Sequence, residues 1–217
     1  MRGRLVLAAL LAATTVASVT ACGGSSAQAF HPSGAVPTAS LGDVPAAASR
    51  VVTAPGGFRF PSGVSVDYAP VPSGSATDRA VLAGYQGYVL SLWAAVLSHG
   101  HDTSYQQRTS GQAQAYVQHE TAFFARGGRA VTGVIGYSAT SVMGVYFGHG
   151  AAVSSCVNAA AFHVANARTG AVTGPVFPAG YARYREEVAE ARRGDGGWYV
   201  TDVQSFPAST SQGAMCR

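Results

Sequence analysis

Apolar residues at helical spacing predict two long helices in the middle of the chain. From Ser75 to His99 they fall on one stripe, as an amphipathic helix requires. This stretch opens with a Ser-Ala-Thr-Asp capping box, in which a side-chain oxygen accepts a hydrogen bond from a free backbone N–H, and Gly100 closes it. A second helix is predicted over 112–126. Its inward-facing residues would be Tyr116, Val117, Thr121 and Phe124.

The second half of the chain changes to the alternating pattern that is typical of strands. The stretch 181–193 is ambiguous, because its Glu and Arg content suits a helix whereas Tyr184, Glu186 and Val188 alternate. The Gly-Asp-Gly-Gly run at 194–197 is a strong hairpin signal, and a hairpin turn needs a strand on each side. We therefore predict a strand at 181–193, with its mixed charges on a solvated face. The other predicted strands are 129–137, 142–147, 151–167 and 198–206, and one long bent strand is the alternative for the first two.

The order of these elements indicates the fold class. Helices followed by strands predict an α+β domain, in which the helices pack on one face of a mostly antiparallel sheet. A short alternating stretch from Phe58 to Tyr68 precedes the first helix. We expect it to form an extended arm laid on the domain.

The N-terminal residues have the pattern of an export signal. Arg2 and Arg4 form a positive start, and the uncharged apolar run 5–19 is too short to span a bilayer comfortably. The Val-Thr-Ala-Cys sequence at 19–22 resembles the lipobox of bacterial lipoproteins. This resemblance implies that residues 1–21 are removed and that acyl chains on Cys22 hold the protein on the extracytoplasmic face of the cell membrane. An ordinary secretory signal with an incidental cysteine is the alternative.

The segment 22–57 separates this signal from the folded part of the chain. It is rich in Ala, Ser, Gly and Pro and has few large apolar residues to bury. We expect a disordered tether that lifts the domain off the lipid surface. The predicted organisation is thus a signal peptide at 1–21, a tether at 22–57 and one domain at 58–217.

Charge gives little indication of a partner. The formal net charge is +4, and loss of Arg2 and Arg4 with the signal would leave twelve arginines against ten acidic residues, or +2. Nucleic-acid binding proteins usually show a clustered basic face, so we expect no nucleic-acid partner.

Two cysteines remain once Cys22 carries lipid. Cys156 and Cys216 are an even pair in an exported, oxidising compartment, which favours a disulfide. Such a bond would close a loop of about 60 residues and stabilise the fold by roughly 4 kcal/mol in the chain-entropy model. Two free buried thiols are the alternative, and two distant cysteines are too few ligands for a metal.

The chain from about residue 75 onward resembles the NTF2-like fold, also called cystatin-like or SnoaL-like. The resemblance rests on two or three helices, long strands and a final hairpin that continues into Gly-Trp-Tyr-Val-Thr-Asp-Val at 197–203. It implies a curved, mostly antiparallel sheet that encloses a cone with the helices. Such cones hold the active sites of ketosteroid isomerases, polyketide cyclases and dehydratases, and they also serve as binding and docking modules.

A narrower resemblance links this chain to exported actinobacterial lipoproteins of the same fold. It rests on Val131-Thr132-Gly133, on the strand that carries Cys156, on the Thr-Gly-Ala-Val at 169–172 and on Cys216. In those proteins the strand cysteine and the terminal cysteine pair, which implies the same pairing here. Many of them also have an acidic residue two positions after the strand cysteine, where this chain has Asn158.

Titratable clusters are few. His99, His101 and Asp102 have ligand chemistry suited to a metal, but they also suit a polar loop at the end of the first helix, and we expect no metal and no cofactor. Glu120 lies near the inward stripe of the second helix. It would be either a general base inside the cone or a boundary residue paired with an arginine such as Arg126.

Aromatic residues on the two predicted helices are the remaining candidates. They suit the core more than a ligand site, and the sequence contains no recognisable set of catalytic residues. We predict a non-catalytic, membrane-anchored module that docks to an envelope protein or holds a small apolar ligand. The alternative is a small-molecule isomerase, cyclase or dehydratase that uses the cone as its active site. The candidate pocket residues are Tyr85, Trp93, Tyr116, Glu120 and Phe124.

Overall fold

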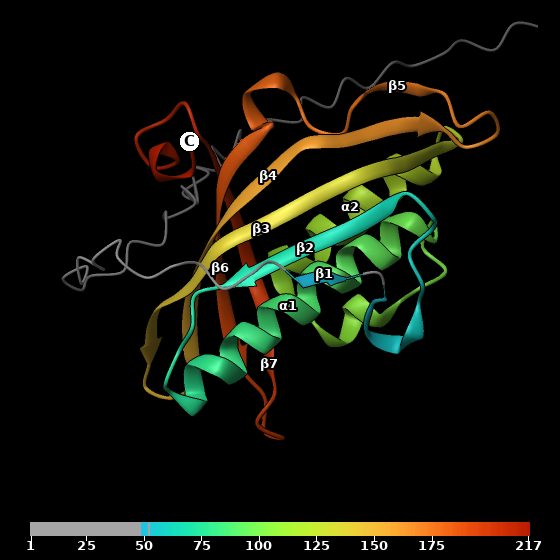
Figure 1. The fold of residues 1–217 in the computed structure, drawn as a ribbon. Helices are drawn as coiled ribbons and strands as arrows, with labels where there is room; N and C mark the ends of the chain where they lie inside the picture. The colour runs from blue at the N-terminus through green and yellow to red at the C-terminus, as the bar shows by residue number, and fades with distance from the viewer. Residues whose placement is uncertain (1–48, 52) are drawn as a thin grey trace, which may run out of the picture. The chain divides into compact units, whose positions relative to one another are not determined.

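The computed structural model describes residues 49–51 and 53–217. The chain divides into two compact units, 1–34 and 35–217, and the first unit lies entirely outside the described residues. The predicted signal peptide, the lipidation site Cys22 and the tether up to residue 48 also lie outside them. The described part is an α+β fold, in which two α-helices lie against a seven-stranded mixed sheet (Figure 1).

Both helices form close to where the sequence predicts them. Helix α1 spans Ala76–Leu97, and the side chain of Ser75 caps it by accepting a hydrogen bond from the backbone N–H of Asp78. Helix α2 spans Gly111–Ala125. The described 3-10 turns are η1 (Pro55–Gly57), η2 (Ser104–Gln107), η3 (Ala179–Tyr181) and η4 (Ala214–Cys216).

The sheet is built around two long strands, β3 (Arg129–Tyr146) and β4 (Gly150–Asn166), which form an antiparallel hairpin. The strand order is β1-β2-β3-β4-β6-β7, and β5 pairs with the far half of β4. Each pairing between these strands is antiparallel except that of β2 with β3. The remaining strands are β1 (Ser49–Val51), β2 (Val64–Pro70), β5 (Val172–Pro175), β6 (Arg183–Arg192) and β7 (Trp198–Pro207).

The segment predicted as an arm enters the sheet as strand β2. It pairs in parallel with β3, with Val64 opposite Gly133 and Tyr68 opposite Tyr137. The connection permits the parallel direction, because the chain passes through α1 and α2 between β2 and β3 and this is long enough for a crossover. Strand β1 and turn η1 fall within the segment predicted as a tether, and β1 pairs with β2.

Helix α1 is the central element of the core. Its apolar length would suffice to cross a membrane, but 78% of that window is buried inside the fold, as in the core helix of a soluble domain. Gly84 allows the closest approach, since a Cβ there would lie 2.7 Å from the Cβ of Trp198 on β7 and 2.8 Å from Oε2 of Glu190 on β6. The sheet and α1 therefore meet almost backbone to backbone at this point.

The expectation of a solvated charged face on 181–193 is wrong in part. The stretch is strand β6, as predicted, but Glu186 and Glu190 are only 3% exposed each. Successive side chains of a strand point to opposite faces, so both carboxyls share the inner face with Tyr184 and Val188. The alternation of residues along the strand thus predicted the buried face better than the presence of charged residues did.

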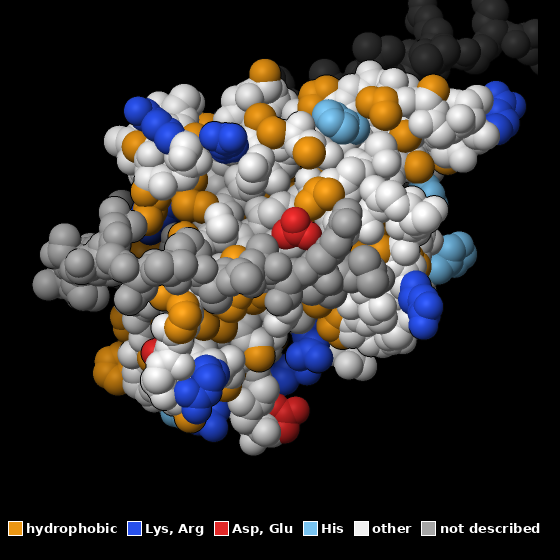
Figure 2. All heavy atoms as spheres, viewed as in Figure 1, with side chains coloured by type: hydrophobic (Ala, Val, Ile, Leu, Met, Phe, Trp, Pro, Cys, Tyr) orange, Lys and Arg blue, Asp and Glu red, His pale blue; other side chains and the backbone are white. Residues whose placement is uncertain are grey.

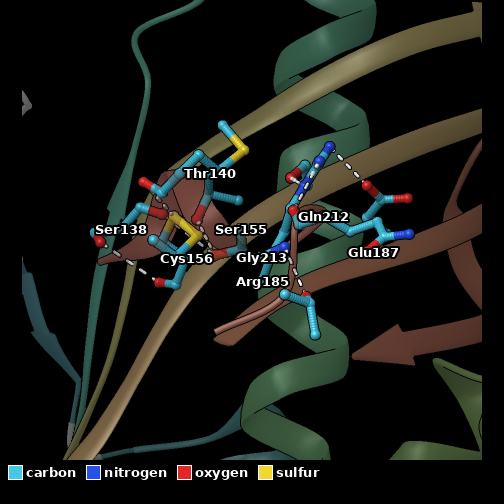
Figure 3. The surroundings of a disulfide bond; sticks show 12 residues. Ser138, Thr140, Ser155, Cys156, Arg185, Glu187, Gln212 and Gly213 are labelled. Carbon is cyan, nitrogen blue, oxygen red and sulfur yellow. Dashed lines mark hydrogen bonds and ion pairs between the residues drawn. A yellow bond between two sulfur atoms is a disulfide. The ribbon is translucent and has the colours of Figure 1, made fainter. Parts of the chain in front are cut away.

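The disulfide between Cys156 and Cys216 confirms the predicted pairing. It ties β4 to the end of the chain across 60 residues, with the two Cα atoms 5.2 Å apart. Arg185 lies beside it and holds the same C-terminal segment (Figure 3): its guanidinium donates hydrogen bonds to Ser154 Oγ and to the carbonyl of Gln212 and forms an ion pair with Glu187 at 2.6 Å.

Candidate functional site

A pocket with a volume of about 360 Å³ opens between α2 and the segment that joins β5 to β6. A volume in this range suits a small organic molecule. The pocket belongs to unit 35–217 throughout, and its walls come from α2, from 176–184 and from one residue of β7. Its lining residues are Tyr116, His119, Glu120, Phe123, Val176, Phe177, Pro178, Tyr181, Tyr184 and Ser205.

One wall of the pocket is aromatic. The ring centroid of Tyr184 lies 5.5 Å from that of Phe177 and 6.0 Å from that of Tyr181, within the range of favourable ring contacts. The opposite wall is one face of α2, because Tyr116, Glu120 and Phe123 are spaced by four and three residues. A ligand between these walls would meet ring surfaces on both sides.

Glu120 is the carboxyl group of this pocket. Burial raises its pKa, and the nearby positive charge of His119 opposes the rise. The expected pairing with Arg126 does not form, because the Nε of Arg126 donates a hydrogen bond to the carbonyl of Ala122 instead. Among the described residues, no side chain donates a hydrogen bond to the Glu120 carboxyl or pairs with it, so its charge is uncompensated at contact distance.

A cluster of buried phenols lies behind the aromatic wall. Tyr184 is 3% exposed and belongs both to the pocket and to this cluster. Deeper inside, Tyr85 donates its hydroxyl hydrogen to Oε1 of Glu186 at 2.7 Å. Burial raises the pKa of Glu186 to about 7, and the Tyr85 hydrogen bond opposes that rise. Tyr88, also fully buried, has a hydroxyl without a hydrogen-bond partner among the described residues.

The structure divides the predicted pocket residues into two groups. Tyr116 and Glu120 line the pocket. Tyr85, Trp93 and Phe124 are at most 3% exposed and belong to the core. The indole N–H of Trp93 donates a hydrogen bond to the hydroxyl of Tyr137 at 3.1 Å, and the ring of Trp93 packs edge-on against Phe162. These three are therefore core residues that do not line the pocket.

The other polar candidates lie elsewhere. The carboxyl of Asp102 accepts hydrogen bonds from the backbone N–H and the hydroxyl of Ser104, which fixes the loop after α1. His99 and His101 beside it are exposed. Within the described ranges, no three His, Cys, Asp or Glu side chains lie close enough together to hold a metal ion. Asn158 is exposed on β4, where its side chain accepts a hydrogen bond from the N–H of Ala160.

Sequence reasoning missed half of the pocket. Phe177 and Tyr181 lie in a short stretch without regular spacing, and the alternation that includes Tyr184 begins only after it, so no periodicity marked the three as one wall. The available signal was the density of aromatic residues around Pro178. For Glu186, the signal was its place in the alternation with Tyr184, which predicts a shared face.

Comparison with known proteins identifies no family. No family model matches the chain, and no curated protein matches it. Solved structures that are similar in part include the two described next. The intermembrane space region of the chloroplast protein ARC6 has 14% identity and a TM-score of 0.40, with 63% of this chain and 99% of that chain covered.

The second is a protein from Shewanella frigidimarina that is provisionally assigned as a ketosteroid isomerase. It has 16% identity and a TM-score of 0.30, with 60% of this chain and 97% of that chain covered. Scores this low carry no argument about function, so the geometry of the pocket must supply it.

Proposed function

We propose that this chain is a lipid-anchored protein of the cell envelope whose domain binds a small, largely apolar molecule without transforming it. The observation that carries the proposal is the pocket between α2 and the aromatic wall of Phe177, Tyr181 and Tyr184. Ligand sites are typically concave and mostly apolar, with a few placed polar groups, and this pocket has that composition. The membrane anchor would be Cys22, through the lipobox-like sequence at 19–22.

An NTF2-like cone is the finer fold that we propose for this domain. The order of elements supports it, because two helices precede the long β3–β4 hairpin and the chain ends in the β6–β7 hairpin. In this proposal the cone is filled at its centre by Tyr85, Tyr88 and Tyr137, each at most 2% exposed. The ligand would then occupy only the outer end, where the pocket opens.

The distribution of exposed apolar side chains favours a small ligand over a docked protein. The exposed large apolar side chains of the described part are spread over separate elements, with Phe123 on α2, Phe147 at the β3–β4 turn, Val172 on β5 and Met215 near the C-terminus. The face drawn in Figure 2 likewise shows hydrophobic side chains interspersed with other side chains and with backbone. Docking sites usually present a contiguous apolar patch instead.

The test is binding of a neutral apolar probe to the full-length, membrane-derived protein in phosphatidylglycerol nanodiscs. Saturation-transfer NMR with 3,3-dimethylbutan-1-ol should show binding to the wild type. Ser205→Phe should abolish it, because Ser205 lines the pocket and its side chain is exposed there. Ser211→Phe is the matched control at an exposed serine outside the pocket. Equal binding by both variants would place the ligand elsewhere.

Glu120 favours a second candidate, a small-molecule isomerase, cyclase or dehydratase. A carboxyl with a raised pKa in a pocket wall is a suitable general acid or base. Catalysis would also need a group to stabilise developing charge, and Glu186 is turned to Tyr85 rather than lining the pocket. Turnover of a ring ketone that Glu120→Gln removes, at unchanged probe binding, would support the enzyme over the binding protein.

A further inference from the structure

We propose that the ligand of this pocket is an organic cation, of the quaternary or tertiary ammonium class, held between aromatic rings and the Glu120 carboxylate. The inference rests on the proposed binding function and names its ligand class. Three features of the described pocket carry it: the rings, the carboxyl and the absence of a competing arginine among the lining residues.

The aromatic wall supplies the first feature. The ring centroids of Phe177 and Tyr181 lie 5.5 Å and 6.0 Å from that of Tyr184. Tyr184 is only 3% exposed, so the accessible ring surface of this wall comes mainly from Phe177 and Tyr181. A ring face attracts a cation through its quadrupole, and aromatic cages recognise methylated ammonium groups in this way. Neutral apolar ligands need no such density of rings, since aliphatic side chains bury their surface equally well.

Glu120 supplies the second feature. Its carboxyl is partly desolvated and has no pairing side chain among the described residues, as set out above. Burying a carboxylate without a partner is unfavourable, and this is why its pKa is raised. A bound cation would provide the missing partner and return the carboxyl to its charged form. His119 also lines the pocket, but its side chain is exposed and lies one residue away on α2.

The position of Arg129 indicates which wall the positive group of the ligand would contact. The Arg129 guanidinium is 4.3 Å from the ring centroid of Phe123 and donates a hydrogen bond to the Phe123 carbonyl. That ring is therefore already occupied by a cation from the chain itself, although Arg129 is not among the lining residues. The ligand's positive group would then contact the opposite wall, beside Phe177 and Tyr181. No lining residue is an arginine, so no arginine of the lining competes with an external cation for this wall.

The experiment compares two probes of one shape. Choline carries a trimethylammonium group, and 3,3-dimethylbutan-1-ol replaces its nitrogen by carbon. Isothermal titration of both into the full-length protein in phosphatidylglycerol nanodiscs, with empty nanodiscs as reference, should show choline binding about tenfold more tightly. Glu120→Gln should weaken choline binding more than binding of the neutral probe, and so reduce that preference, of which the rings supply the remainder. Glu187→Gln is the control, since it deletes a carboxylate that pairs with Arg185 outside the pocket.

A second variant tests the rings independently of Glu120. Tyr181→Leu keeps apolar bulk and deletes a ring, so it should weaken choline more than it weakens the neutral probe. Equal affinity for the two probes in the wild type would overturn the cation assignment and leave the proposed binding function standing. Binding of neither probe would overturn both. A choline preference that is undiminished in Glu120→Gln would overturn the role of Glu120.

Discussion

Tyr85 on α1 and Glu186 on β6 are joined by a 2.7 Å hydrogen bond across 101 residues of sequence. This contact links the central helix to the inner face of the sheet. It also places a carboxyl where burial raises its pKa to about 7, well above its ordinary value of 4.5. A carboxyl that does not line the pocket therefore makes the stability of the domain sensitive to pH.

The first prediction concerns that sensitivity. Between pH 4.5 and about 7 the folded state holds a proton on Glu186 that the unfolded chain has released, so stability should fall as pH rises through this range. The loss attributable to Glu186 should be on the order of 3 kcal/mol. Glu186→Gln stays neutral and still accepts from Tyr85, so its free energy of unfolding should vary less with pH. Urea titrations of both proteins across this range measure the difference.

Glu190 contributes in the same direction, because burial also raises its pKa. A residual slope in Glu186→Gln is therefore expected, and the double variant with Glu190→Gln should flatten it further. Glu187→Gln, on the opposite face of β6, serves as control and should keep the wild-type slope. An unchanged slope in the double variant would contradict the account of these two carboxyls.

The second prediction compares two glycines of α1. Gly84→Ala would place a methyl group 2.7 Å from the Cβ of Trp198 and 3.2 Å from its carbonyl, so it should destabilise the fold by about 1–3 kcal/mol. Gly87→Ala meets only the flexible side chain of Arg108, at 3.3 Å. The higher helix propensity of alanine should then leave stability unchanged or raise it by up to about 1 kcal/mol. Thermal unfolding of the two variants should thus diverge, and equal melting temperatures would show that Gly84 is not a close contact.

The third prediction concerns the disulfide. Replacing Cys156 and Cys216 by serine should destabilise the domain by up to about 4 kcal/mol, because the unfolded chain regains the entropy of a long loop. Differential scanning calorimetry with and without reductant measures this loss in the wild type. The double-serine protein should show no further response to reductant. A wild type that melts at one temperature in both conditions would contradict a stabilising role for the bond.

The fourth prediction concerns Cys22, which lies outside the described residues. If the lipobox-like sequence is processed, intact-mass measurement of the membrane fraction should find a chain that begins at an acylated Cys22. Cys22→Ser should move the protein from the membrane to the soluble fraction. Retention of Cys22→Ser in the membrane at the wild-type level would rule out this anchor.

Local signals predicted the elements of this fold well. The capping box at Ser75 marks the start of α1, and the Gly-rich turn at 194–197 shows that β6 is a strand despite its helix-forming residues. These features act over a few residues, so the sequence displays them directly. The parallel pairing of β2 with β3 depends on how the intervening helices pack, and no short-range pattern encodes it.

The pocket was harder to predict for the same reason. Tyr116 and Glu120 were recognised because they share a helix face, whereas the wall around Phe177 comes from a stretch without periodicity. The buried position of Glu186 was available from its alternation with Tyr184, but its charge suggested a solvated face. Alternation identifies the face of a strand more reliably than residue charge, because a buried acid can be kept neutral by its surroundings.

Ligand protection of His119 is the measurement that tests the central claim most directly. His119 lines the pocket, whereas His101 and His149 are exposed outside it, so the three serve as target and internal controls in one chain. Full-length protein is treated with diethyl pyrocarbonate, with and without saturating 3,3-dimethylbutan-1-ol, and modification is quantified by peptide mass spectrometry. The account predicts slower modification of His119 alone when the probe is present. Modification of His119 at the same rate with and without the probe would contradict a ligand in this pocket.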